Sequence, residues 1–193
     1  MSTQTIPPGV IETYTGAFVD PLNLENEPPG KIRLPDIAAS LAKQCRYAGH
    51  CRRFYSVAEH CVLASRLVET ELNGNHDANL GALLHDASEA YLVDLPRPIK
   101  SQLSEYRAAE DSAQRAIYKK FRVVIGVDER RMIDAADDFL LAEEAFCLMP
   151  SRGAGWPSLQ AETAIPRGRT LFRFLDPERA EAAFIARFVE LTL

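Results

Sequence analysis

The stretch Gly81–Lys100, GALLHDASEAYLVDLPRPIK, decides how the rest of this chain is interpreted. Its centre is the dyad His85-Asp86, followed by Glu89. The surrounding residues favour a helix, and neither Gly nor Pro interrupts the run until Pro96. Within such a helix, His85 and Glu89 would be neighbours one turn apart. An imidazole and a carboxylate inside an apolar run are costly to bury, and a divalent cation is the most economical compensation.

Two further segments carry the same residue types on separate predicted helices. Upstream, the run 54–64, FYSVAEHCVLA, contains His60. Downstream, the run 132–144, MIDAADDFLLAEE, contains Asp137. Taken alone, the dyad would favour a partly exposed His and Asp on a surface helix. The order His, then His-Asp, then Asp on three helices favours a shared metal site instead.

This order and spacing resemble the HD-domain superfamily of metal-dependent phosphohydrolases. More narrowly, SVAEH, LLHDASEAYLVDLPRPIK and AAD resemble the branch of bacterial 5′-deoxynucleotidases and phage nucleoside triphosphohydrolases. The resemblance covers roughly residues 36 to 148. It implies an all-α helical bundle in one domain over 1–193, with its core at about 36–148 and a C-terminal loop and helix at 150–193.

The resemblance also implies roles for the motif residues. It assigns one divalent metal ion to four ligands: His60, His85, Asp86 and Asp137. Asp137 is preferred to Asp134 and Asp138 because AAD before an apolar run matches the family pattern. Mixed nitrogen and oxygen ligands suit cobalt, manganese, zinc, nickel or magnesium, and the residue types leave that choice open. Glu89 and Asp94 are the candidate catalytic residues, Glu89 as the group that orients or deprotonates water.

Candidate substrate contacts precede the first motif and lie in the proline-rich loop. They are Arg46, Tyr47, Arg52, Arg53 and Lys100. Arg46 stands where the family has an arginine that contacts phosphate or sugar, and Tyr47 where related enzymes place an aromatic residue against sugar or base. Arg52 and Arg53 could bind outer phosphates through planar, bidentate donors, with solvated surface charge as the alternative.

Local signals predict the remaining elements. Ser56 and Glu59 form a capping box for a helix that ends at about Leu72. A continuous helix over about 77–92 carries the dyad, and Pro96 and Pro98 make 94–100 a stiff loop. The other predicted elements are a short hairpin over 11–20, a loop over 21–30, helices over 37–44, 103–121 and 128–149 (capped by Asp128), a lid or connector over 150–166 containing Trp156, and a last helix capped by Asp176.

Composition limits the class of protein. The 193 residues suit a single domain, and with 47% hydrophobic and 25% charged residues the chain has an ordinary globular composition. A net charge of −5 argues against a nucleic-acid polymer as partner. No apolar run approaches the roughly 20 residues of a membrane span, and the N-terminus lacks a signal-peptide pattern. We therefore expect a cytoplasmic protein without a membrane partner, whose four cysteines form no CxxC pair and stay reduced.

Three functions follow as hypotheses. The first is removal of phosphate from deoxynucleoside 5′-monophosphates. The second is cleavage of deoxynucleoside triphosphates, which Arg52 and Arg53 mildly favour because a longer phosphate chain needs more cations. The third is a catalytically silent HD scaffold that binds nucleotides, against which the retained ligand positions and Glu89 weigh. Because related enzymes are often oligomers of one chain, the resemblance also implies a homo-oligomer.

Overall fold

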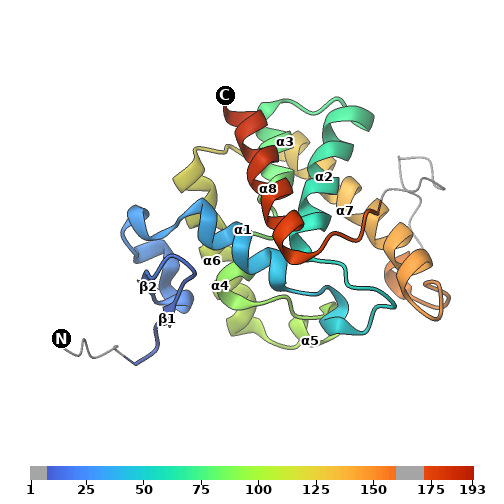
Figure 1. Ribbon diagram of the computed structural model, residues 1–193, viewed down its shortest axis with the longest axis horizontal. Helices are drawn as coiled ribbons and strands as arrows, with labels where there is room; N and C mark the ends of the chain where they lie inside the picture. Colours follow the sequence, from blue (N-terminus) through green and yellow to red (C-terminus); the bar gives the residue numbers. More distant parts are fainter. Residues whose placement is uncertain (1–7, 160–171) are drawn as a thin grey trace.

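The computed structural model describes residues 8–159 and 172–193, and these are mostly helical (Figure 1). The helices are α1 (Leu34–Lys43), α2 (Val57–Glu71), α3 (His76–Leu83), α4 (Glu89–Leu92), α5 (Arg97–Lys100), α6 (Ser104–Phe121), α7 (Val127–Leu148) and α8 (Pro177–Thr192). Short 3-10 helices lie at η1 (Pro21–Asn26), η2 (Pro29–Lys31), η3 (Tyr47–Gly49) and η4 (Pro157–Leu159). The prediction of an all-α fold is confirmed.

The predicted N-terminal hairpin is also confirmed. Strand β1 (Ile11–Glu12) pairs antiparallel with β2 (Phe18–Val19). The hairpin is tied to α1 by the buried carboxylate of Asp36, which accepts the backbone N–H of Thr15 at 2.6 Å and its hydroxyl at 2.9 Å. This carboxylate lies in the first turn of α1, where the helix dipole favours negative charge.

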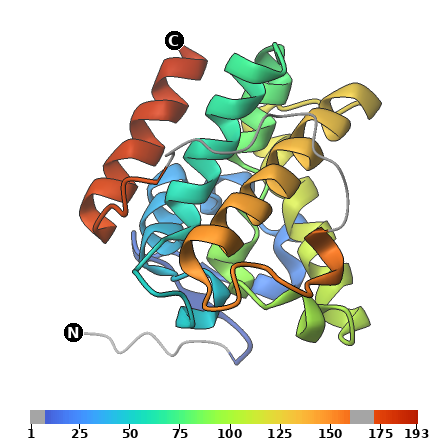
Figure 2. The same cartoon turned by 90° about the vertical axis from the view of Figure 1, so that its right-hand side faces the viewer.

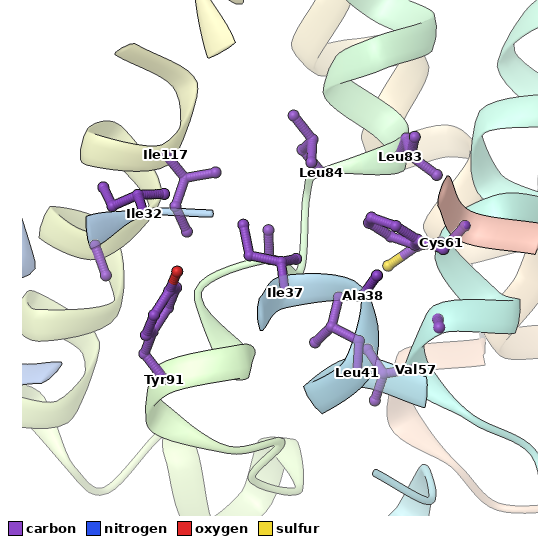
Figure 3. Close-up of a cluster of buried hydrophobic side chains, with 14 of the residues drawn as sticks. Ile32, Ile37, Ala38, Leu41, Val57, Cys61, Leu83, Leu84, Tyr91 and Ile117 are labelled. Atoms are coloured by element: carbon purple, nitrogen blue, oxygen red, sulfur yellow. The ribbon is translucent and has the colours of Figure 1, made fainter. Parts of the chain in front are cut away.

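Helix α2 lies at the centre of the bundle, in contact with α1, α3, α7 and α8 (Figure 2). Two apolar clusters surround it. One cluster includes Ile37, Leu41, Leu83 and Ile117, and Cys61 of α2 points into it (Figure 3). The other joins α2, α3 and α7 with the C-terminal segment. The buried apolar core includes Val19, Phe172 and Phe184, which lie outside the region 36–148 covered by the family resemblance.

The continuous helix predicted over 77–92 is wrong. Helix α3 ends at Leu83, α4 begins at Glu89, and the dyad lies in the turn between them. In a continuous helix the Ala82 carbonyl would accept the N–H of Asp86, but the ring of His85 takes that carbonyl at 2.7 Å. The amide of Gln114 on α6 donates to the Leu84 carbonyl and accepts from the Ser88 N–H, which stabilises the turn.

Several element limits also differ from the predictions. Pro98 is compatible with the first turn of a helix, so the stiff loop predicted over 94–100 contains α5. Helix α7 is capped by Gly126, whose N–H donates to Glu129, and not by Asp128. The 21–30 segment forms η1 and η2 rather than a plain loop. The part of the 150–166 segment beyond residue 159 lies outside the described residues.

Within the described ranges, none of the helices is long and apolar enough to cross a membrane.

The packing of α8 gives a stability prediction. Phe184 is fully buried in the first cluster, whereas Val189 on the same helix is 41% exposed. We expect Phe184→Ala to lower the free energy of unfolding by about 3–5 kcal/mol, because it removes buried area and leaves a cavity. Val189→Ala is the matched control and should change it by less than about 1 kcal/mol. Urea denaturation followed by circular dichroism measures both, and equal effects would show that α8 is not part of the core.

Candidate metal centre

Three predicted ligands meet in one group. His60 comes from the first turn of α2, and His85 and Asp86 come from the turn after α3. The two Nε2 atoms are 3.2 Å apart, and the Asp86 Oδ2 lies 3.3 Å from that of His85 and 3.7 Å from that of His60. The His60 side chain is fully buried, and Asp86 is 22% exposed. This group of residues can hold a metal ion.

The hydrogen-bond partners fix which nitrogen of each ring faces the group. His85 Nδ1 lies 2.7 Å from the Ala82 carbonyl, which can only accept, so this nitrogen carries the proton. His60 Nδ1 lies 2.7 Å from the buried carboxylate of Glu144 and donates to it in the same way. In the neutral rings both Nε2 lone pairs therefore point at each other across 3.2 Å. Two lone pairs at this distance repel unless a cation lies between them.

The donor set fits a divalent ion. Ligand atoms about 2.1 Å from a metal lie about 3.0–3.4 Å apart in octahedral or tetrahedral geometry, close to the separations found here. Without a metal, a proton can take the same place on His60. Burial and Arg46 lower the pKa of His60, but the carboxylates of Glu144 and Asp137 outweigh them and raise that pKa to about 9.

The fourth predicted ligand, Asp137, adjoins the group from α7. Its Oδ1 lies 3.2 Å from His60 Nε2, and its Oδ2 pairs with Arg97 at 2.8 Å. Burial raises the pKa of Asp137, but His60 and His85 lower it well below its usual range. Asp138 is half exposed and faces Arg97 instead, at 4.0 Å. The choice of Asp137 over its neighbour therefore agrees with the geometry.

The two predicted catalytic carboxylates lie on the other side of Asp86. Glu89 is buried, and its Oε2 has no hydrogen-bond partner among the described residues. Burial raises the pKa of Glu89, and the nearby carboxylates of Asp86 and Asp94 raise it further. Gln44 connects this pair, because its amide donates to the Glu89 carbonyl and accepts the N–H of Asp94, both at 2.9 Å.

Lys100 reaches the same region from α5. Its ammonium group donates to Glu89 at 3.2 Å and to Glu110 at 2.6 Å. Burial lowers the pKa of Lys100, but the two carboxylates outweigh it and keep the lysine charged. Lys100, a predicted substrate contact, therefore lies beside the predicted catalytic residue Glu89.

Arg46 and Tyr47 also lie beside the group. Arg46 pairs with Glu144 at 3.1 Å and with Asp86 at 3.4 Å, and the Tyr47 hydroxyl donates to Glu144 at 2.7 Å. Their turn is tight, since Tyr47, Ala48 and Gly49 all have positive φ. The bend therefore involves two residues other than glycine, Tyr47 and Ala48, for which this conformation is strained.

Arg52 and Arg53, the remaining predicted contacts, are directed elsewhere. The guanidinium of Arg53 stacks on the ring of Phe174 at 3.8 Å. Arg52 is exposed, and its backbone N–H donates to the Leu148 carbonyl at the end of α7. Neither contact involves the metal-binding group.

The chain is 34% identical over 184 residues to the uncharacterized protein YfdR of Escherichia coli K12, covering 94% of this chain and 95% of that protein. It belongs to the YfdR family. A second relative, the uncharacterized protein RCAP_rcc00048 of Rhodobacter capsulatus, is 31% identical over 179 residues, covering 86% and 88% of the two chains. No protein-family profile matches the chain. Neither relative's name states an activity, so membership of the YfdR family does not by itself assign one.

Two carboxylates of this family member have contacts that the sequence interpretation did not assign. Glu144, which contacts His60, follows Asp137 by seven residues, two turns along the same face of α7, and that spacing was the available signal. Glu59 was interpreted as half of a capping box. Its backbone N–H does donate to Ser56, but its carboxylate accepts three backbone N–H groups, those of Arg173, Phe174 and Leu175. Pairing across 114 to 116 residues leaves no local signal.

The geometry predicts that removing one ring abolishes tight metal binding. We expect the wild-type protein to bind Mn²⁺ or Co²⁺. The substitution His85→Ala should weaken this binding by more than about 100-fold, because loss of a ligand costs more than the roughly 10–100-fold typical for loss of a residue that only orients a ligand. His76→Ala, an exposed histidine at the start of α3, is the control and should bind as the wild type does. Isothermal titration calorimetry measures the affinities. Equal affinity for all three proteins would place the metal elsewhere.

Proposed function

We propose that this protein is a divalent-metal-dependent phosphohydrolase of the HD superfamily that removes phosphate from deoxynucleoside 5′-monophosphates. The observation that supports it is the pair of Nε2 atoms of His60 and His85, directed at each other beside Asp86, with buried Glu89 nearby. The resemblance of the motifs to HD phosphohydrolases supplies the reaction class, and the donor chemistry agrees with it.

The proposed ligands are His60, His85, Asp86 and Asp137. A divalent ion held by them would polarise a phosphoryl oxygen and lower the pKa of water, whichever of cobalt, manganese, zinc, nickel or magnesium is bound. Both rings keep a proton on Nδ1 and offer Nε2 as the coordinating atom, so a metal would take the place that a proton can occupy on His60 Nε2.

Glu89 is the proposed general base. Its Oε1 is held by Lys100, while the buried Oε2 has no partner within the described residues and can accept a proton from water. The raised pKa of Glu89, caused by burial and by Asp86 and Asp94, brings its proton affinity closer to that of a base working near neutral pH. Asp94, held by Gln44, is proposed to accept a hydrogen bond from the reacting oxygen or its leaving group.

Arg46 and Lys100 are proposed to balance the phosphate charge. Arg46 has five N–H donors, and its contacts to Glu144 and Asp86 use Nε and Nη1. Lys100 has three donors and gives two of them to Glu89 and Glu110. Each cation therefore keeps a donor for a phosphate oxygen, in a region of low dielectric where such a contact is strong.

The structure favours a monophosphate over a triphosphate as substrate. Arg53, one of the two residues that supported the triphosphate alternative, stacks on Phe174. The cations near the group are already paired with carboxylates, including Arg97 with Asp137. A triphosphate would bring more negative charge to this region without additional cations to meet it.

We further propose a cytoplasmic location and a homo-oligomer of this chain. Light scattering during size-exclusion chromatography tests the oligomeric state.

The proposed substrate class predicts a specific product pattern. Incubation of the metal-loaded protein with mono-, di- and triphosphates of deoxynucleosides and ribonucleosides should release inorganic phosphate from deoxynucleoside monophosphates. Chromatography of the products distinguishes this outcome from release of a longer phosphate chain, which would mark the triphosphate activity. Binding without turnover for every divalent ion would instead support the silent scaffold.

Glu89 gives a test of the catalytic assignment. Glu89→Gln keeps the shape of the side chain but removes the basic oxygen, so we expect the kcat to fall by about 10²–10⁴-fold. Metal affinity measured by calorimetry should be unchanged, because Glu89 is not a proposed ligand. Glu105→Gln, on the exposed part of α6, is the control for the charge change. Full activity in Glu89→Gln would exclude Glu89 as the base.

A further inference from the structure

The carboxylate of Glu144 accepts several hydrogen bonds beside the metal centre, and the proposed function assigns it no role. Glu144 of α7 is fully buried, and three side chains from two other segments contact it. Its Oε1 meets Nδ1 of His60 at 2.7 Å. Its Oε2 accepts from Arg46 Nε at 3.1 Å and from the Tyr47 hydroxyl at 2.7 Å. These contacts join the proposed metal ligand to the proposed substrate-binding turn.

We propose that Glu144 is a positioning residue that fixes His60 with Nε2 toward the metal centre and, through the same carboxylate, sets Arg46 against Asp86. This inference rests on the metal-dependent function proposed above. Glu144 itself is not directed at the reacting atoms; it acts through His60 and Arg46.

The chemistry of the partners requires a carboxylate here. Arg46 offers only donors, and its Nε–H and the Tyr47 hydroxyl both point at Oε2. The opposite oxygen is then left to accept from His60 Nδ1, which places the proton on that nitrogen and the lone pair on Nε2. Both oxygens of the Glu144 side chain act as acceptors in these contacts, which is what a carboxylate provides.

An amide of the same shape cannot satisfy all three partners. If the Gln oxygen faced Arg46 and Tyr47, its NH₂ group would face His60 Nδ1 and favour the proton on Nε2, the nitrogen needed for the metal. If the oxygen faced His60, the NH₂ group would face the Arg46 Nε–H, donor against donor. Either orientation disturbs one of the two groups that Glu144 positions.

The test is Glu144→Gln in the full chain, with metal binding as the first measurement. We expect the affinity for Mn²⁺ or Zn²⁺, measured by calorimetry, to fall about 10–100-fold, the usual effect of losing a partner that orients a metal-bound histidine. Asp134→Asn is the matched control. It makes the same charge change on the same helix, at a side chain that is 62% exposed and faces Arg130, and it should leave the affinity unchanged.

A second measurement separates orientation from a loss of charge. In the Zn²⁺-loaded protein labelled with ¹⁵N-histidine, the Nδ1 proton of His60 should give a downfield, exchange-protected resonance because it donates to a buried carboxylate. Glu144→Gln should shift or remove this resonance. The Nδ1 proton of His85, which donates to the Ala82 carbonyl, is the internal control and should keep its position.

The outcomes distinguish this inference from the proposed function. Failure of the wild-type protein to bind any divalent ion would overturn the proposed function. Tight binding by the wild type together with wild-type affinity and an unchanged His60 resonance in Glu144→Gln would overturn the role of Glu144 alone.

If Glu144→Gln does not fold, Glu144→Asp replaces it, since it keeps the buried charge but withdraws the carboxylate from His60 by about one carbon–carbon bond. Unchanged metal affinity in that folded variant would likewise overturn the role.

Discussion

The constraint on which this structure depends is the approach of two buried imidazole nitrogens, His60 Nε2 and His85 Nε2, to 3.2 Å. Each ring is held from behind by an acceptor, the Glu144 carboxylate for one and the Ala82 carbonyl for the other. Neutral rings in this arrangement repel. The fold therefore favours a positive charge at this point, and carboxylates from the turn after α3 and from α7 add to that preference.

The charges around the two rings also favour a bound cation. Carboxylates from several segments converge on this region: Asp86, Glu89, Asp94, Glu110, Asp137 and Glu144. The cations that pair with them are Arg46, Arg97 and Lys100. Buried carboxylates without enough cations are unfavourable. A divalent cation beside the rings offsets this excess, so the acidic surroundings support metal binding as well as the ligand set does.

The sequence was a better guide to which residues would lie together than to the elements that carry them. The resemblance of the motifs to a known family implied the all-α fold and the grouping of His60, His85 and Asp86, and local strand and turn signals predicted the hairpin. The break between α3 and α4 was not predictable, because it depends on Gln114 of α6, distant in sequence, bonding to Leu84 and Ser88. Helix propensities for residues 81–92 describe local preference, and here tertiary hydrogen bonds override them.

The position of Glu89 shows what the break changes. In the predicted helix, Glu89 would share a face with His85. In the structure it opens a new helix and is placed by Gln44 and Lys100 rather than by helical spacing from the histidine. The residue therefore reaches the site for a different physical reason from the predicted one. Contacts between distant segments, such as those of Gln44 with Glu89 and Asp94, have no periodic signature, which is why the pairing of these residues could not be predicted from the sequence.

The C-terminal segment supports the turn that carries Arg46. The Glu59 carboxylate accepts three successive backbone N–H groups from residues 173–175, so the segment before α8 is fixed to the first turn of the helix that carries His60. Phe174 of that segment then supports Arg53, and the rings of Phe172 and Phe174 pack on Tyr55, whose carbonyl accepts the N–H of Arg46. Residues of the C-terminal segment thus hold the turn that carries Arg46, the proposed substrate contact, from behind. Because the C-terminal segment supports the Arg46 turn, we expect similarity to relatives to extend beyond the motif region. The similarity to the YfdR protein does so, since it covers 94% of this chain.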